Sequence, residues 1–250
     1  MKKWFIIIIM LIIPSLAFSD TFTLRIGYFV PFAKSDLWDI EFENMDFSKN
    51  NFQRINLGFS YEGFITNEIS LEAGMDNYNR LKWGMYNEYV GVYTLNGEFA
   101  FPNNYIKDFS ISHSFNVSMM PFFLSLKITP LGRRSRVIPY IGGGVNVYLW
   151  SVRIYGDMID FSDTWYYYDE DIQADVEVYP IYEVNAQEND NWAIGYHAFL
   201  GFMMPLANRI TFDFEFRYNY GKGEFKDAYL GFQPFDLGGY QISVSLNYWF

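Results

Sequence analysis

The sequence predicts an all-β fold, an eight-stranded antiparallel barrel whose strands run up and down in chain order. Eight segments alternate apolar and polar residues with a period of two, which is the pattern of a strand with one apolar face. The connections between these segments alternate between long and short, as expected when short turns lie at one rim and long loops at the other. Aromatic residues make up 22% of the chain, which favours strands and membrane interfaces over helices.

Residues 1–19 have the character of a secretory signal peptide. Met1 is followed by two lysines and an apolar run, and small residues such as Ala17 and Ser19 precede a cleavage point before Asp20. The apolar run is shorter than the about 20 residues that a membrane-spanning helix needs. We therefore expect residues 20–250 to form one exported domain; the alternative is that the segment remains as a membrane anchor.

The first half of the chain contains four of the expected strands. They cover residues 21–32, 52–64, 68–76 and 110–128. A short link at 65–67 joins the second strand to the third as a hairpin. In the fourth strand, the apolar residues stand at odd positions up to Met119 and at even positions from Phe122. Because Pro121 lies at this change of phase and cannot donate to a ladder, we expect a β-bulge there.

The second half contains the other four strands. They cover residues 137–150, 192–205, 210–220 and 239–250. The three glycines at 142–144 lack the frame of a phosphate-binding loop, so we interpret them as a place of strand curvature. The remaining short turns are 129–135 and 206–209, and the long loops are 33–51, 78–109, 152–191 and 221–238. Ten strands remain possible if 88–101 or 173–184 enters the barrel.

The alternation alone does not say which face of the wall lies inside. A water-soluble barrel such as a lipocalin would place the apolar set inward. Three features favour the inverted, transmembrane arrangement: the apolar set is too bulky for a narrow lumen, aromatic residues gather near strand ends, and the polar set carries charges of both signs. Phe212, Phe214 and Phe216 on one strand show the first feature.

The polar faces of the strands then predict a network of charged side chains inside the barrel. Its expected members are Arg25, Arg54, Glu62, Glu72, Asp76, His197, Asp213, Glu215 and Arg217. Buried charges persist only when they are paired, and the lumen of an eight-stranded barrel is just wide enough for side chains to fill it. We therefore expect a lumen plugged by side chains; a narrow channel for small or hydrophobic solutes is the alternative.

The last strand alternates strictly from Tyr240 through Tyr248 and ends on an aromatic residue, Phe250. Together with the runs Val137–Trp150 and Ile210–Gly221, it resembles the small bacterial outer-membrane β-barrel superfamily, which includes the transmembrane domain of outer-membrane protein A and the outer-membrane protein W type. The resemblance implies that Tyr240, Tyr248 and Phe250 form the signal read by the barrel assembly machinery. It also implies contacts with periplasmic chaperones, outer-membrane lipid and lipopolysaccharide, both termini in the periplasm, and a monomer.

Composition narrows the classes of function. A formal charge of −11 argues against nucleic acid as a partner, and the absence of cysteine excludes disulfides, thiolate metal sites and cysteine nucleophiles. Some barrels of this kind modify lipid A, but His113 and Ser114 are adjacent in a strand and point to opposite faces. The acidic stretch 152–191 has no EF-hand frame, so we favour a solvated loop over a site for Ca²⁺ or Mg²⁺. We expect no catalytic residues, no metal, no cofactor, and a structural or surface-interaction role through the long loops.

Overall fold

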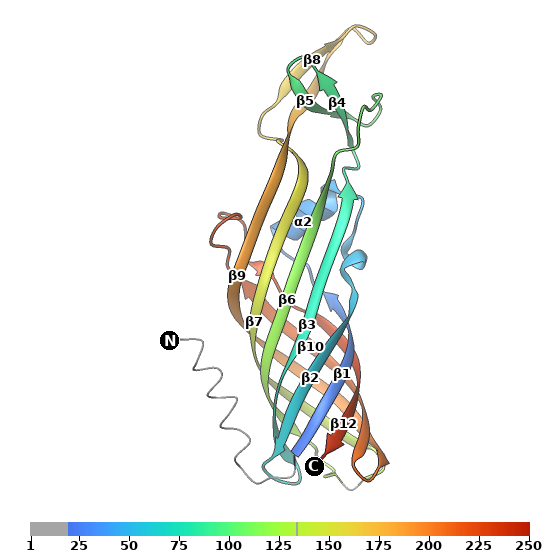
Figure 1. Cartoon of the computed structure of the whole chain (residues 1–250), viewed down its shortest axis with the longest axis vertical. Coiled ribbons are helices and arrows are strands. Elements are labelled where there is room, and N and C mark those ends of the chain that lie inside the picture. The colour runs from blue at the N-terminus through green and yellow to red at the C-terminus, as the bar shows by residue number, and fades with distance from the viewer. Residues whose placement is uncertain (1–19, 134) are drawn as a thin grey trace.

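The computed structural model describes residues 20–133 and 135–250, and it shows a closed antiparallel barrel (Figure 1). Eight strands form the wall: β1 (Asp20–Pro31), β2 (Arg54–Phe64), β3 (Ile69–Met85), β6 (Ser112–Ile128), β7 (Ile138–Ile159), β9 (Ala174–Ala207), β10 (Ile210–Gly223) and β12 (Gly239–Trp249). Each strand pairs with the next, and β12 pairs with β1 to close the barrel. The prediction of an eight-stranded antiparallel barrel is confirmed. The predicted signal peptide, residues 1–19, lies outside the described residues.

The smaller elements belong to the long loops. They are α2 (Asp36–Asn44), the 3-10 turn η2 (Lys49–Phe52), β4 (Tyr89–Thr94), β5 (Gly97–Pro102), β8 (Trp165–Asp169) and β11 (Phe235–Asp236). Strands β4, β5 and β8 join the first part of β9 in a small sheet beyond the barrel, which we call the head. The ten-strand alternative is therefore wrong. Within residues 20–133 and 135–250, no helix has the length and apolar character needed to cross a bilayer.

The wall of the barrel is high on one side and low on the other (Figure 1). Strands β3, β6, β7 and β9 have 17, 17, 22 and 34 residues, whereas β1, β2, β10 and β12 have between 11 and 14. The segments 78–109 and 152–191 are thus largely strand, which corrects the prediction that they are loops. The loops of the low wall explain the difference, since they pack on the inner faces of the extended strands and bury them.

Strand β6 contains no bulge at Pro121, so that prediction is wrong. Its pairing with β3 and β7 keeps one register throughout, and odd-numbered side chains point inward along its whole length. The apolar residues of β6 switch between even and odd positions because the environment inside the barrel changes along the strand. Below Pro121 the apolar residues face outward, as at Leu124 and Leu126, whereas above it they face an apolar interior, as at Phe115 and Val117.

A register shift does occur at the same height, on another strand. Met119 of β6 pairs with Trp150 of β7, and the pairing of β7 with β9 shifts by one residue between Trp150 and Val152. This irregularity turns Glu188 of β9 inward, where its side chain is fully buried. A bulge at this level therefore re-aims one acidic side chain into the interior.

The lower half of the barrel carries an apolar belt on its outside. Exposed apolar side chains form it on every strand of the wall, including Leu24, Ile26, Leu57, Phe59, Leu71, Leu126, Ile141, Val145, Ile194, Leu200, Phe214, Ile242 and Leu246. On β6 the outward positions are apolar from Ile128 to Met120 and then become polar at Ser118 and Asn116. This belt with a polar interior is the inverted arrangement of a transmembrane barrel, and it disfavours the soluble alternative.

Candidate functional site

The lower lumen holds a chain of buried ion pairs. The Nη2 atom of Arg25 lies 2.9 Å from Glu72 Oε1, and its Nη1 atom lies 3.4 Å from Asp76 Oδ1. Asp76 is shared, because its Oδ2 atom lies 3.8 Å from Nη1 of Arg217. Arg217 also lies 2.9 Å from Glu215 Oε1. Each charge therefore faces an opposite charge, which is the condition under which ions persist away from water.

A second group of charges lies nearer the short turns. Lys127 Nζ is 3.1 Å from Glu62 Oε2, and Arg133 Nη2 is 3.6 Å from Glu62 Oε1. The hydroxyl of Tyr140 donates to Asp213 Oδ1 at 2.6 Å, and the ammonium of Lys127 lies 4.1 Å from the centre of the Tyr140 ring. The two groups meet around Tyr140, which also lies 3.2 Å from Glu215 Oε2.

The structure brings together eight of the nine residues expected in the network and leaves out Arg54. Arg54 belongs to the inward-facing set by its position, but it is the first residue of β2 and is exposed at the rim. There its Nη1 atom donates to the carbonyl oxygen of Asn79 at 2.5 Å. Its expected place in the lumen is therefore wrong, because the strand ends before the side chain can be enclosed.

Sequence reasoning missed Lys127, Tyr140 and Phe123, all of which face the lumen. Lys127 stands at an odd position between Leu126 and Ile128, which are exposed on the outer face of the wall. The alternation of β6 below Pro121 is therefore the sequence signal that could have assigned Lys127 to the lumen. The Phe123 ring centre lies 4.4 Å from the guanidinium carbon of Arg217 and 5.3 Å from that of Arg25. Aromatic faces thus accompany the ion pairs inside the barrel.

The upper lumen is filled by the two loops of the low wall, residues 33–53 and 224–238. Trp38 of α2 is fully buried, and its ring centre lies 5.0 Å from Phe52, 5.1 Å from Phe115 and 5.1 Å from Phe235. Phe235 in turn stacks on Trp150 of the high wall at 5.8 Å. Both loops therefore belong to one aromatic core, which we call the plug.

Polar contacts anchor both loops of the plug to the high wall. Glu188, turned inward by the bulge, accepts from the backbone nitrogens of Lys226 and Asp227 at 3.0 and 3.1 Å. Tyr78 Oη donates to the carbonyl oxygen of Phe52 at 2.6 Å, and Arg80 Nε donates to that of Asn51 at 2.6 Å. These bonds satisfy backbone groups that the loops would otherwise bury without partners.

Glu41 and His113 form a buried pair between α2 and β6. Nε2 of His113 lies 2.9 Å from Glu41 Oε2, and Nδ1 lies 3.3 Å from the carbonyl oxygen of Asp157. Each ring nitrogen of His113 therefore faces an oxygen atom within hydrogen-bond distance. The pair fixes the height of α2 in the barrel mouth.

A small cavity marks the boundary between the polar lower lumen and the plug. It has a volume of about 20 Å³ and is bordered by Asp76, Asn219 and Gln241 below the rings of Phe29, Tyr78 and Tyr148. Such a volume is close to the room that a single water molecule requires.

The two histidines lie in different parts of the barrel and have different partners. The hydroxyl of Ser114 donates to the carbonyl oxygen of Tyr155 at 3.1 Å, whereas His113 contacts Glu41, so the adjacent pair does not meet. His197 lies in the lumen with Nε2 2.8 Å from Ser125 Oγ, a contact that sequence reasoning missed. Among the described residues, its Nδ1 atom has no hydrogen-bond partner, so the acidic residue that would orient a catalytic histidine is missing there.

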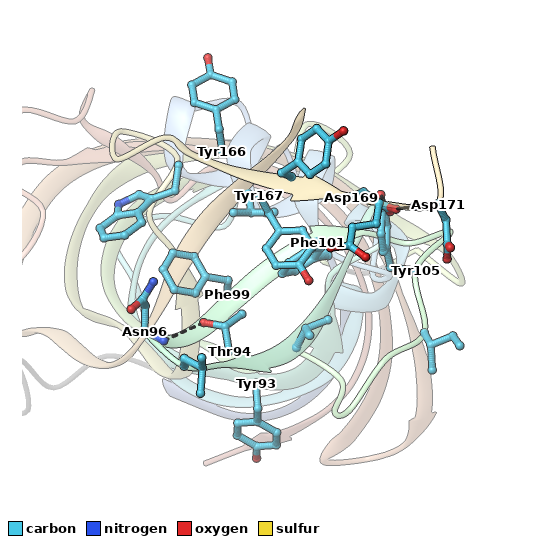
Figure 2. Close-up of a pocket in the computed structure, with 17 residues that line it drawn as sticks. Tyr93, Thr94, Asn96, Phe99, Phe101, Tyr105, Tyr166, Tyr167, Asp169 and Asp171 are labelled. Carbon is cyan, nitrogen blue, oxygen red and sulfur yellow. Dashed lines mark hydrogen bonds between the residues drawn. The ribbon is translucent and has the colours of Figure 1, made fainter. Parts of the chain in front are cut away.

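The head contains a large open pocket on the concave side of its sheet, and Figure 2 shows its lining. The volume is about 790 Å³. Phe99 and Phe101 of β5 form the floor with Val178, and the ring centres of Trp165 and Tyr167 each lie 5.3 Å from one of these phenylalanines. Trp165 and Tyr167 remain 45% and 48% exposed, so their rings are available to a ligand.

One rim of the pocket is acidic. The hydroxyl of Tyr105 donates to Asp169 Oδ2 at 2.7 Å, which holds the pKa of Asp169 below its usual value and raises the pKa of Tyr105 to about 12. Glu170 and Asp171 follow in the turn between β8 and β9 and also border the pocket. Across the described ranges, no three histidine, aspartate or glutamate side chains gather in a way that could hold a metal ion.

The chain was also compared with known proteins. No family model matches it, and no curated protein matches its sequence. Among solved structures it is similar to outer membrane protein OprG from Pseudomonas aeruginosa, with a TM-score of 0.48 and 13% identity over 94% of this chain and 96% of that one. It is similar to Neisserial surface protein A, with a TM-score of 0.44 and 12% identity over 93% and 97% of the two chains. For outer membrane protein W of E. coli the TM-score is 0.42, with 14% identity over 94% and 100%.

Proposed function

We propose that the protein is an integral β-barrel of a bacterial outer membrane, non-enzymatic, whose closed lumen supports a binding head outside the cell. The observation that carries this proposal is that side chains of the described residues occupy the lumen at successive heights. Ion pairs occupy the lower lumen, the aromatic plug occupies the mouth, and the cavity between them has a volume of about 20 Å³. A barrel filled in this way is a rigid support for the head.

The proposed orientation places the short turns and both ends of the domain in the periplasm. Asp20 and Phe250 lie together at the rim of the short turns, where the Phe250 nitrogen donates to the Asp20 carbonyl oxygen at 3.0 Å. Tyr240, Tyr248 and Phe250 are exposed on the outer surface of the barrel, in keeping with an assembly signal. The partners we propose are the assembly machinery, periplasmic chaperones, outer-membrane lipid and lipopolysaccharide, around a monomeric barrel.

Flux through liposomes tests the closed lumen. Purified protein refolded into vesicles should not release a small entrapped dye or conduct ions, and truncation of the plug at 36–47 should leave the lower ion pairs to block the passage. Conductance by the unaltered protein would overturn the proposal in favour of a narrow channel.

Mass analysis of lipid A after overexpression tests the non-enzymatic role. It should show no change, and a modified lipid A would instead establish an enzyme.

Proteolysis of intact cells tests the orientation. Cleavage should fall in the head, at 89–109 or 160–173, and spare the turns at 65–68 and 208–209. Cuts confined to the turns would place the head in the periplasm and would contradict the proposed surface role.

A further inference from the structure

We propose that the head captures an extended basic polypeptide segment of another protein, which lies in the aromatic pocket and pairs along the free edge of β8. The inference rests on the proposed function only in requiring that the head be accessible. Three features of the head lead to it: the shape of the pocket, the unpaired strand beside it, and the charge of its lining.

The pocket has the form of a groove along β8. Trp165, Tyr167 and Asp169 alternate along one face of this strand, opposite Val178 and Val176 of β9. In Figure 2 the Tyr167 ring lies over the floor formed by Phe99 and Phe101, whereas Tyr166 points away from it. An elongated ligand that follows β8 would therefore contact one aromatic side chain at every second residue.

The two edges of the head sheet differ in how they are protected. The edge at β4 is covered, because Gly91 bridges to Phe109 and the nitrogen of Tyr93 donates to Asp108 Oδ2 at 2.8 Å. Within the described part of the chain, β8 pairs with β9 alone. Its five residues include no proline and no lysine, the usual means by which edge strands avoid pairing with other chains. An open edge of this kind can accept an additional strand.

The charge of the groove selects a basic ligand. The 17 lining residues include Asp169, Glu170 and Asp171 but no lysine, arginine or histidine. Lys107 follows the lining residue Ile106 in sequence, and its Nζ atom donates to Ser110 Oγ at 3.4 Å. Exposed tryptophan and tyrosine faces attract cations, and carboxylates at the rim add to that attraction. Phosphate groups and acidic polymers are repelled by the same lining.

The experiment is a binding titration of the full-length protein in detergent micelles, in which the fluorescence anisotropy of labelled peptides reports binding. A short peptide of alternating lysine and valine should bind, and the salt dependence should show the contribution of charge. A peptide of alternating glutamate and valine should not bind. Spermine or a neutral oligosaccharide should compete weakly, because neither can pair with the β8 backbone. Equal binding of both peptides, or stronger binding of spermine or sugar, would overturn the proposal.

Three variants locate the site. Tyr167→Ala removes a ring from the groove and should weaken binding about fivefold, as should Glu170→Gln combined with Asp171→Asn. Tyr182→Ala removes an exposed tyrosine of β9 that does not line the pocket, and it should change affinity less than twofold. Equal effects of Tyr182→Ala and Tyr167→Ala would place binding outside the groove.

The outcomes separate this inference from the proposed function. If the liposomes stay sealed and the intact-cell cuts fall in the head, but the lysine peptide does not bind, the barrel proposal stands and the ligand assignment is wrong. If the peptide binds in micelles and the vesicles conduct, the head assignment stands and the closed lumen is wrong.

Discussion

The lower and upper halves of the barrel differ in which side of the wall is apolar. On the lower part of β6, Lys127 points inward and Leu126 outward, whereas on the upper part Phe115 points inward and Ser118 outward. One continuous strand with an unbroken register therefore serves two environments. The lower half is built as a membrane barrel is, and the upper half is built as a water-soluble barrel is.

The difference shows that the surroundings of a strand, and not its geometry, decide whether its inward-facing or its outward-facing residues are apolar. In the proposed membrane barrel, lipid covers the outside of the belt, and the interior of the belt holds charges that must be paired. Above the belt, the interior is filled by aromatic rings from the loops of the low wall. On β6 the phase changes near Pro121, and outward apolar side chains give way to polar ones above it. On β3 exposed apolar side chains continue above this height, at Leu81, Trp83 and Met85.

Removing one charge from the lower lumen should have the largest effect. Arg217→Leu leaves Glu215 and Asp76 buried without this partner, so we expect a loss of about 3–5 kcal/mol in the free energy of unfolding. This free energy is measured by urea unfolding in micelles, with the folded fraction read from the gel shift between unheated and heated protein. Arg54→Leu is the matched control at the exposed rim and should cost less than about 0.5 kcal/mol. Equal costs would mean that the lumen charges are not enclosed.

A charge added to the outer surface should cost much more stability in the lower half of the barrel than in the upper half. Leu124→Lys places an ammonium on the apolar belt and should destabilise the folded protein in lipid vesicles by about 2–4 kcal/mol. Tyr155→Lys makes the same change on the outward face of β7 above the belt and should cost less than about 0.5 kcal/mol. A large penalty for Tyr155→Lys would extend the lipid boundary up the high wall and break the comparison.

The lower half could be predicted from the sequence because its alternation is local. Residues such as Asp213 and Glu215 stand between phenylalanines, so the period of two assigns them to one face without knowledge of their partners. The upper half could not be predicted in this way. Its inward residues on β6 are apolar because α2 and the loop 224–238 return to cover them, and contacts between such distant segments leave no periodic signal. The phase change was visible at Pro121, but pattern alone did not distinguish a bulge from a change of surroundings.

The pair between Glu41 and His113 tests whether the plug is fixed to the high wall. Glu41→Ala leaves a buried ring nitrogen without its partner, so we expect the docking of α2 to weaken by about 1–3 kcal/mol. The barrel should keep its gel shift while protease gains access to residues 36–47. Glu41→Gln is the matched control, since its amide can donate to Nε2 of a neutral imidazole, and it should protect the loop as the carboxylate does. Loss of the whole barrel fold in Glu41→Ala would show that the plug and the wall fold as one unit.

The smallest effect is expected in the head, where the half-buried carboxylate of Asp169 accepts hydrogen bonds from Tyr105 and from two turn nitrogens. The hydrogen bond from Tyr105 holds the pKa of Asp169 below its usual value, so the ionised carboxylate favours the folded head. Because the pKa is lowered on folding, this contribution is present above the ordinary aspartate pKa of about 3.9 and is lost as the pH falls through the lower, folded value.

Tyr105→Phe should raise the pKa of Asp169 toward that ordinary value, which carboxyl NMR of selectively labelled protein measures. The midpoint of urea unfolding at neutral pH should change little, because both groups are partly accessible to water and two turn nitrogens still hold the carboxylate. An unchanged pKa of Asp169 in Tyr105→Phe would show that the turn nitrogens of Asp171 and Ile172, which also contact this carboxylate, are sufficient to hold it ionised. Charges in the lumen and charges in the head would then differ in their partners as well as in their burial.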